Sequence, residues 1–92
     1  MTERITPRQF HEADGVEDWR VLGGFGACAS FRTGSFGVGV TLVDAIGGLA
    51  DAADHHPDVD LRYGSVTVRL TTHEVEGLSE RDLTLAREIS AA

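Results

Sequence analysis

Three of the four histidines of this chain lie between positions 55 and 73: His55, His56 and His73. Carboxylates flank them on both sides, at Asp51 and Asp82. An imidazole has an unperturbed pKa of about 6.5, so it can give and take protons near neutral pH. Two such groups on suitable sides of a bound molecule can act as general acid and base, each typically contributing roughly 10²–10⁴-fold in rate. The cluster therefore predicts proton-transfer chemistry.

The spacing of Asp51 and His55 predicts that they share one face of a helix. Residues four apart on a helix are neighbours, so the Asp51 carboxylate can orient the His55 imidazole. Pro57 cannot continue the helix, which places His55 and His56 at its C-terminal end. His73 follows a predicted strand, and the end of that strand could bring it opposite His55.

Two other interpretations of the same residues are open. Three histidines and a water molecule could hold a catalytic zinc ion. Adjacent histidines generally point in different directions, however, and the chain has no HExxH or paired-cysteine pattern, so we expect no metal site. The histidines could also end a helix and a strand without a chemical role. Asp82 stands three residues after Ser79, where a carboxylate stabilises a helix start whether or not it contacts a substrate, and we favour that capping role.

The size and composition of the chain exclude several classes of protein. Ninety-two residues suit one domain spanning 1–92, whose small core would gain stability from association with further copies. Eight basic against 15 acidic residues give a net charge of −7, which argues against binding to nucleic acid. The single cysteine, Cys28, cannot form an internal disulfide, so we expect a cytoplasmic protein. We expect neither a secretory signal nor a membrane segment, since the longest apolar stretch, 38–49, is too short to span a bilayer.

Capping signals predict three helices. Thr6 followed by Pro7 opens a short first helix. Ser35 can cap a long helix to about Ala53, whose apolar residues form two neighbouring stripes and predict a wide buried face. The run Ser-Glu-Arg-Asp at 79–82 resembles a capping box and begins a last amphipathic helix.

Alternating apolar residues predict four strands in two hairpins, at 19–22, 27–31, 59–63 and 66–71. The first hairpin is connected across the glycine-rich residues 23–26. The second is expected to turn at Gly64-Ser65, which places Tyr63 opposite Val66 and makes one side of the hairpin apolar. The order helix, two strands, helix, two strands, helix predicts an α+β domain of two layers, a four-stranded antiparallel sheet with helices on one face.

The spacing of the site residues also resembles that of a known family. The signature of pterin-4a-carbinolamine dehydratases, also called 4a-hydroxytetrahydrobiopterin dehydratases, is similar to this pattern: Asp51, three residues, His55-His56-Pro57, five residues, Tyr63, nine residues, His73, eight residues and Asp82. The segment THEVEGLSERDLTLA at 72–86 is similar to the family's stretch from its last histidine into its last helix. The resemblance covers about residues 19–90.

This resemblance implies a fold and an activity. The fold is α-ββ-α-ββ-α, usually assembled as a homodimer or homotetramer. The activity is that of a hydro-lyase that dehydrates 4a-hydroxytetrahydropterin to quinonoid dihydropterin without a cofactor. It serves tetrahydrobiopterin biosynthesis by recycling the pterin used by an aromatic amino acid hydroxylase, which is a possible partner in the pathway.

By resemblance, His55, His56 and His73 match the family's active-site histidines, and Asp51 takes the place of its helix carboxylate. We assign His55 and His73 as the acid and base pair, with either order open, and His56 to substrate binding and polarisation of the leaving hydroxyl. The following residues would bind the pterin: Asp54, Thr71, Thr72, Glu74 and Asp82. The chain departs from many members at Val59, where they carry an aromatic residue, and the loss of ring stacking there affects the predicted substrate affinity.

Two functions from other classes fit the same fold. The chain could be a non-catalytic binding or assembly factor that acts through an oligomer surface, as some members of the family do. It could also carry a pterin without turning it over. Retention of all three histidines together with Asp51 favours the enzyme, whereas Val59 points slightly toward a binding protein.

Overall fold

The structure, a computed structural model, describes residues 3–22 and 26–92. Its elements follow one another in this order: β1 (Arg4–Ile5), α1 (Pro7–Glu12), β2 (Arg20–Leu22), β3 (Gly26–Arg32), α2 (Phe36–Ala53), β4 (Asp58–Arg62), β5 (Ser65–Leu70), the 3₁₀ turn η1 (His73–Val75), β6 (Leu78–Ser79) and α3 (Glu80–Ala91). Most of the predicted glycine-rich connection between β2 and β3, residues 23–25, lies outside the described residues.

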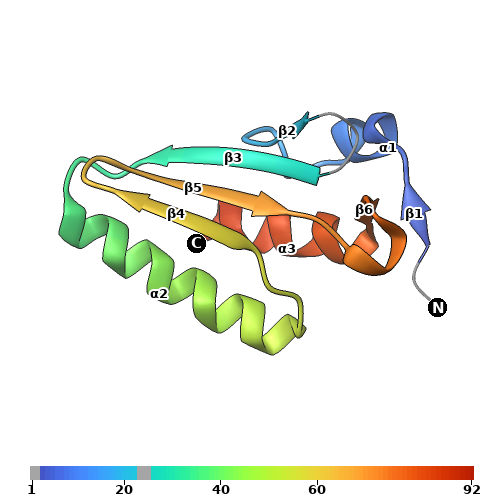
Figure 1. Ribbon diagram of the computed structural model, residues 1–92. Coiled ribbons are helices and arrows are strands. Elements are labelled where there is room, and N and C mark those ends of the chain that lie inside the picture. Colours follow the sequence, from blue (N-terminus) through green and yellow to red (C-terminus); the bar gives the residue numbers. More distant parts are fainter. Residues whose placement is uncertain (1–2, 23–25) are drawn as a thin grey trace.

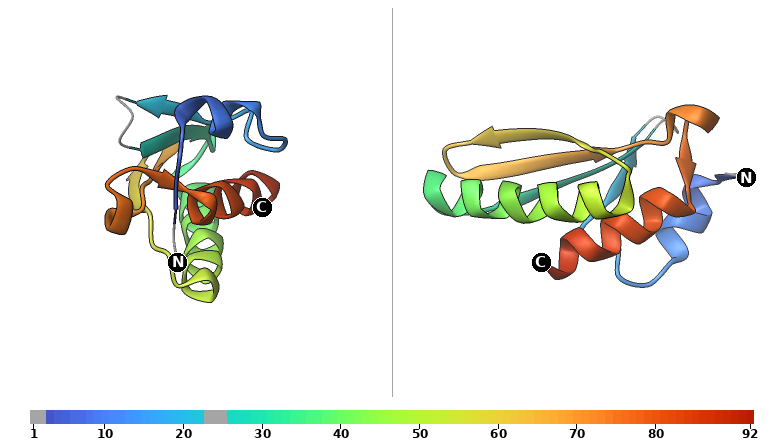
Figure 2. Two further views of the ribbon diagram at one scale, coloured as in Figure 1. Left: turned by 90° about the vertical axis from the view of Figure 1, so that its right-hand side faces the viewer. Right: turned by 90° about the horizontal axis from the view of Figure 1, so that it is seen from below.

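Four of the strands form an antiparallel sheet in the order β2-β3-β5-β4. Helices α2 and α3 lie beside each other on one face of this sheet, as Figure 1 and Figure 2 show. The predicted α+β fold, with helices on one side of a four-stranded antiparallel sheet, is therefore confirmed. The pair β1 and β6 forms a separate small sheet that the sequence did not predict.

All three predicted helix starts are confirmed. The Thr6 hydroxyl accepts a hydrogen bond from the Gln9 amide, and the Gln9 side chain accepts one from the Thr6 amide. The Ser35 hydroxyl accepts from the amide of Val38 at 3.2 Å. Ser79 caps α3 in a capping box whose second member is the carboxylate at position 82. Each cap satisfies backbone N–H groups that have no partner inside the helix.

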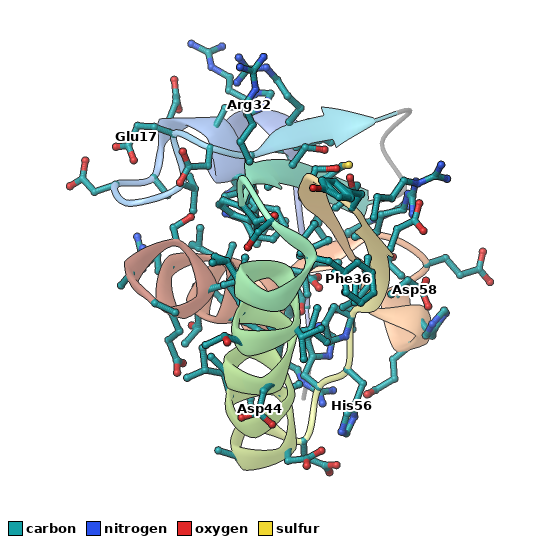
Figure 3. All side chains as sticks on the ribbon, turned by 90° about the vertical axis from the view of Figure 1, so that its left-hand side faces the viewer. Glu17, Arg32, Phe36, Asp44, His56 and Asp58 are labelled. Atoms are coloured by element: carbon teal, nitrogen blue, oxygen red, sulfur yellow. The ribbon has the colours of Figure 1, made fainter. Side chains whose placement is uncertain are left out.

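The core lies between the sheet and the helices. Its buried apolar residues come from every layer: Phe10, Val16, Trp19, Ala27, Ala29, Ile46, Val66, Val68, Leu70, Leu78, Leu83, Leu85, Ala86 and Ile89. The indole N–H of Trp19 donates to the Ser90 hydroxyl at 2.9 Å, which attaches α3 to the segment before β2. Arg32, at the end of β3, extends from the opposite face of the sheet, away from the helices (Figure 3).

The second hairpin turns one residue earlier than the sequence predicted. Arg62 pairs with Ser65 and Leu61 with Val66, so the turn residues are Tyr63 and Gly64 instead of Gly64 and Ser65. The predicted register is therefore wrong by two residues. A shift of two leaves every side chain on the same face, because side chains alternate with a period of two, so the apolar pattern could not distinguish the registers. Tyr63 does not face Val66 and is 75% exposed.

The buried face of α2 is narrower than the two apolar stripes predicted. Only Gly39, Ile46 and Ala50 are fully buried, whereas Phe36 and Val38 are 51% and 54% exposed. The whole helix, at 18 residues and a mean hydropathy of 1.4, meets the length and composition of a membrane span, although the stretch 38–49 is shorter. It alone does so among the described residues, and one such helix is a weak indication.

Candidate active site

The end of α2 sets the position of the first histidine pair. The helix ends at Ala53, and Asp54 adopts a left-handed conformation with φ of 50°. The His55 amide then donates to the Ala50 carbonyl at 3.1 Å, so the chain turns back toward the core at this point. A left-handed residue after the last helical one is a common helix ending. His55 is consequently 7% exposed instead of lying on the surface of a continuing helix.

The carboxylate that contacts His55 is Asp82, not Asp51. The Nε2 atom of His55 lies 2.6 Å from Oδ1 of Asp82, and Asp82 is fully buried. The predicted pairing of Asp51 with His55 is wrong because it required a helix continuing through position 55. Asp51 instead contacts His56, with 2.9 Å between its Oδ1 and the Nε2 of His56, and both side chains are exposed. His56 lies beside the last turns of α2 and projects outward (Figure 3).

Asp82 also holds the segment that follows β5. Its Oδ2 accepts hydrogen bonds from the Thr72 hydroxyl at 2.6 Å and from the Ser79 amide at 2.9 Å. The hydroxyls of Thr72 and Ser79 lie 2.7 Å apart. The predicted capping role of Asp82 is confirmed. The contact with His55 is an additional role of Asp82. The sequence did not reveal it, because the capping box alone was sufficient to explain an aspartate at this position.

The segment from Thr72 to Gly77 forms the second wall of the site. The Thr72 amide donates to the Gly77 carbonyl at 2.7 Å, and the two residues form an isolated β-bridge. Between them runs η1, which begins at His73 and ends at Val75, and the next residue, Glu76, adopts a left-handed conformation. The bridge closes this loop at its base, so His73 stands at a fixed place on it, with its side chain exposed.

These two walls enclose an open pocket of about 340 Å³. Its lining residues follow the end of α2 and the end of β5. Both of these ends lie toward the same end of the sheet (Figure 1). Its lining contains seven of the nine residues predicted for the site: Asp54, His55, His56, Thr71, Thr72, His73 and Glu74. Asp51 and Asp82 do not line it; Asp51 contacts the pocket residue His56, and Asp82 is fully buried behind His55. Asp82 acts on the pocket through His55.

Arg81 also lines the pocket, and the sequence analysis did not assign it to the site. Its guanidinium donates to the Asp54 carbonyl and to the Glu74 carboxylate. A signal was available: Arg81 lies in the first turn of α3, where the helix dipole disfavours a positive charge. An arginine in the first turn of a helix therefore suggests a role outside the helix, and here that role is its contacts with the Asp54 carbonyl and the Glu74 carboxylate.

The hydrogen bonds around Asp82 fix the tautomer of a neutral His55. An ionised carboxylate only accepts hydrogen bonds, so the Nε2 of His55 must carry a proton toward Asp82. In the neutral ring Nδ1 is then the free base. Within the described ranges, no three His, Cys, Asp or Glu side chains are grouped closely enough to hold a metal ion. The arrangement is suited to moving protons to and from a small molecule between His55 and His73.

Comparisons with known proteins place the chain among its relatives. The sequence profile of the family described as Pterin 4 alpha carbinolamine dehydratase matches residues 3–92. A protein of Chloroflexus aggregans, provisionally named a pterin-4-alpha-carbinolamine dehydratase, is 40% identical over 72 residues, covering 78% of this chain and 77% of the relative. A protein of Nocardia farcinica with the same provisional name is 37% identical over 89 residues, covering 96% of this chain and 93% of the relative.

Two solved structures share the fold. A crystal structure described as a transcriptional coactivator/pterin dehydratase from Brucella melitensis is similar with a TM-score of 0.88 and 28% identity, covering 97% of both chains. A pterin dehydratase-like protein described as a RuBisCO assembly factor in the alpha-carboxysome has a TM-score of 0.70 and 22% identity, covering 82% of this chain and 88% of its own. The second likeness shows the fold alone.

Proposed function

Because this chain belongs to the pterin-4a-carbinolamine dehydratase family, we propose that it dehydrates 4a-hydroxytetrahydropterin to quinonoid dihydropterin, in tetrahydropterin recycling. One observation carries the proposal: His55, His56 and His73, from two separate segments, line one pocket. A pocket with proton-transferring groups on two sides meets the needs of a dehydration.

The reaction requires two proton transfers. The bond between C4a and the hydroxyl oxygen breaks, the oxygen leaves as water with a proton from an acid, and a ring N–H gives its proton to a base while its electron pair forms a C=N bond. In our proposal His55 is the base, because its contact with Asp82 leaves Nδ1 unprotonated in the neutral ring. His73 is then the acid, and His56 polarises the leaving hydroxyl.

The pocket also offers groups that could bind a pterin ring. A pterin presents several N–H donors and ring acceptors along its edge. The Glu74 carboxylate and the Thr71 hydroxyl lie on one wall, and Asp54 lies on the other. Hydrogen bonds to such groups fix the orientation of a ligand and leave its reacting carbon facing the histidines. No step of the proposed reaction draws on a cofactor.

The test is the rate at which the purified protein accelerates loss of 4a-hydroxytetrahydropterin, generated in situ by an aromatic amino acid hydroxylase. We expect clear acceleration over the spontaneous reaction, and at least a tenfold loss in His73→Ala, since an acid catalyst typically contributes roughly 10²–10⁴-fold. His11→Ala is the matched control, because His11 is exposed and lies outside the pocket. No acceleration by the folded wild-type protein would refute the dehydratase and favour the binding or assembly factor.

The proposal extends to assembly and location. Exposed apolar side chains on α2, among them Phe36, Val38 and Val40, would be covered if copies of the chain associated through this helix. This supports a homodimer or homotetramer. The unpaired thiol of Cys28 is in keeping with work in the reducing cytoplasm.

A further inference from the structure

Arg81 is a pocket residue for which the proposed proton transfers have no use. Its Nη2 donates to the backbone carbonyl of Asp54 at 2.6 Å, and its Nη1 donates to Oε1 of Glu74 at 2.9 Å. Asp54 immediately precedes His55, and Glu74 immediately follows His73. One guanidinium is therefore bonded to the neighbours of both histidines.

These two contacts join segments that are otherwise separate at the mouth of the pocket. Asp54 belongs to the left-handed turn after α2, and Glu74 belongs to η1. Deeper inside, Asp82 already joins the same two walls, because it contacts His55 on one and Thr72 on the other. Two consecutive residues in the first turn of α3 thus hold the walls together at two depths.

We propose that Arg81 is a positioning residue that sets the separation of His55 and His73 across the pocket. The inference rests on the proposed function for its consequence in turnover, and on the geometry alone for its consequence in structure. The planar guanidinium suits this task, because its N–H groups point in fixed directions and can hold two acceptors in one plane. A lysine would place a single ammonium on a flexible chain.

The charges of the bridge contribute little to folding. The side chains of Arg81 and Glu74 are 35% and 66% exposed, and ion pairs this exposed add little to stability. Loss of Arg81 should therefore act mainly on the arrangement of the pocket and only slightly on the unfolding equilibrium. This separates a positioning role from a structural one.

The chain offers a matched control for this arginine. Arg62 is paired with Asp60 at 3.3 Å, both side chains are substantially exposed, and neither lines the pocket. Arg62→Gln removes one positive charge and one surface ion pair, as Arg81→Gln does. A difference in activity between the two variants is then due to the position of Arg81 at the pocket, because both variants lose the same charge.

The experiment compares wild type, Arg81→Gln, Arg81→Lys and Arg62→Gln in steady-state dehydration, in urea unfolding, and in NMR spectra of the histidine ring C–H groups. We expect Arg81→Gln to lower kcat/KM at least tenfold per folded molecule and to shift the ring signals of His55 and His73. Arg81→Lys should recover part of the activity. Arg62→Gln should match wild type in kcat/KM and in the ring signals of His55 and His73.

The outcomes separate the two proposals. An active wild type with an equally active Arg81→Gln would overturn the positioning role, as would an activity loss explained entirely by unfolded protein. An inactive wild type would refute the dehydratase, and the ring signals would then decide alone: unchanged signals of His55 and His73 in Arg81→Gln overturn the positioning role, and shifted signals support it.

Discussion

Replacement of Asp82 by asparagine tests whether one buried carboxylate serves both the fold and the chemistry. Three hydrogen bonds reach this side chain: from His55, from the Thr72 hydroxyl and from the Ser79 amide. An asparagine side chain has nearly the same size as aspartate and keeps one acceptor oxygen, but it replaces the other oxygen with an NH₂ group and has no charge. Two donors point at Oδ2, so we expect the amide oxygen to take that place and the NH₂ group to face His55.

The change in stability can be worked from these bonds. A hydrogen bond to a charged group contributes about 1.5–3 kcal/mol and a neutral one about 0.5–1.5 kcal/mol. Loss of the charge therefore costs roughly 1 kcal/mol for each bond, or about 3 kcal/mol for all three. In a domain of this size about 1 kcal/mol corresponds to about 4–8 °C in Tm, so the loss of about 3 kcal/mol in Asp82→Asn should lower Tm by roughly 12–24 °C.

The change in rate follows from the tautomer. An NH₂ group that faces Nε2 of His55 donates to it, so the ring proton moves to Nδ1 and that nitrogen is no longer a free base. We expect kcat to fall at least tenfold at a temperature where the variant is still folded. The assay is turnover per folded molecule, with the folded fraction taken from urea unfolding.

Glu80→Gln is the matched control, because Glu80 is exposed in the same first turn of α3. It should lose only the favourable interaction of a carboxylate with the helix dipole, about 0.3–1 kcal/mol, and keep its rate. Wild-type kcat in folded Asp82→Asn would refute the argument that Asp82 sets the tautomer of His55. A stability equal to wild type would refute the count of three charged bonds.

Three further substitutions, all in α2, have predicted outcomes. Gly47→Ala should stabilise the domain by about 0.5–1 kcal/mol, because a methyl group there meets open space and alanine favours the helix. Gly39→Ala should be less stable than Gly47→Ala by about 1 kcal/mol or more, because its methyl group would lie 2.7 Å from a Leu61 methyl that must move; equal urea midpoints for the two would contradict this packing. Val38→Asp should convert the proposed oligomer to monomers in sedimentation equilibrium, and a monomeric wild type would refute self-association.

Signals confined to a few neighbouring residues predicted the local structure. The caps at Thr6, Ser35 and Ser79 marked the helix starts, since each depends on side chains within three residues of the cap. The hairpin register failed because two turns fit the same alternation. The pairing of β1 with β6 was not predicted, and neither was the 3₁₀ turn η1. Strands of two residues and single turns are too short to show a periodic pattern of apolar residues.

The sequence predicted most of the residues of the candidate site but not which of them contact one another. His55, His56 and His73 could be recognised by type and spacing, and they line one pocket. The contact of His55 with Asp82 joins residues 27 apart and depends on how α3 docks, which no local pattern reports. The left-handed conformation of Asp54 was not predicted either. It turns His55 toward the core, and Asp51 therefore contacts His56 instead of His55.

The dual attachment of Asp82 has a consequence for how the protein opens. The Ser79 amide and the His55 ring are bound to the same carboxylate, so the first turn of α3 and the orientation of the imidazole are lost together if that helix undocks. A partial opening at the C-terminal end would abolish the proposed catalysis while the four-stranded sheet stays formed. Heat inactivation would then begin below the global melting temperature, and hydrogen exchange at the Ser79 amide would follow the same opening.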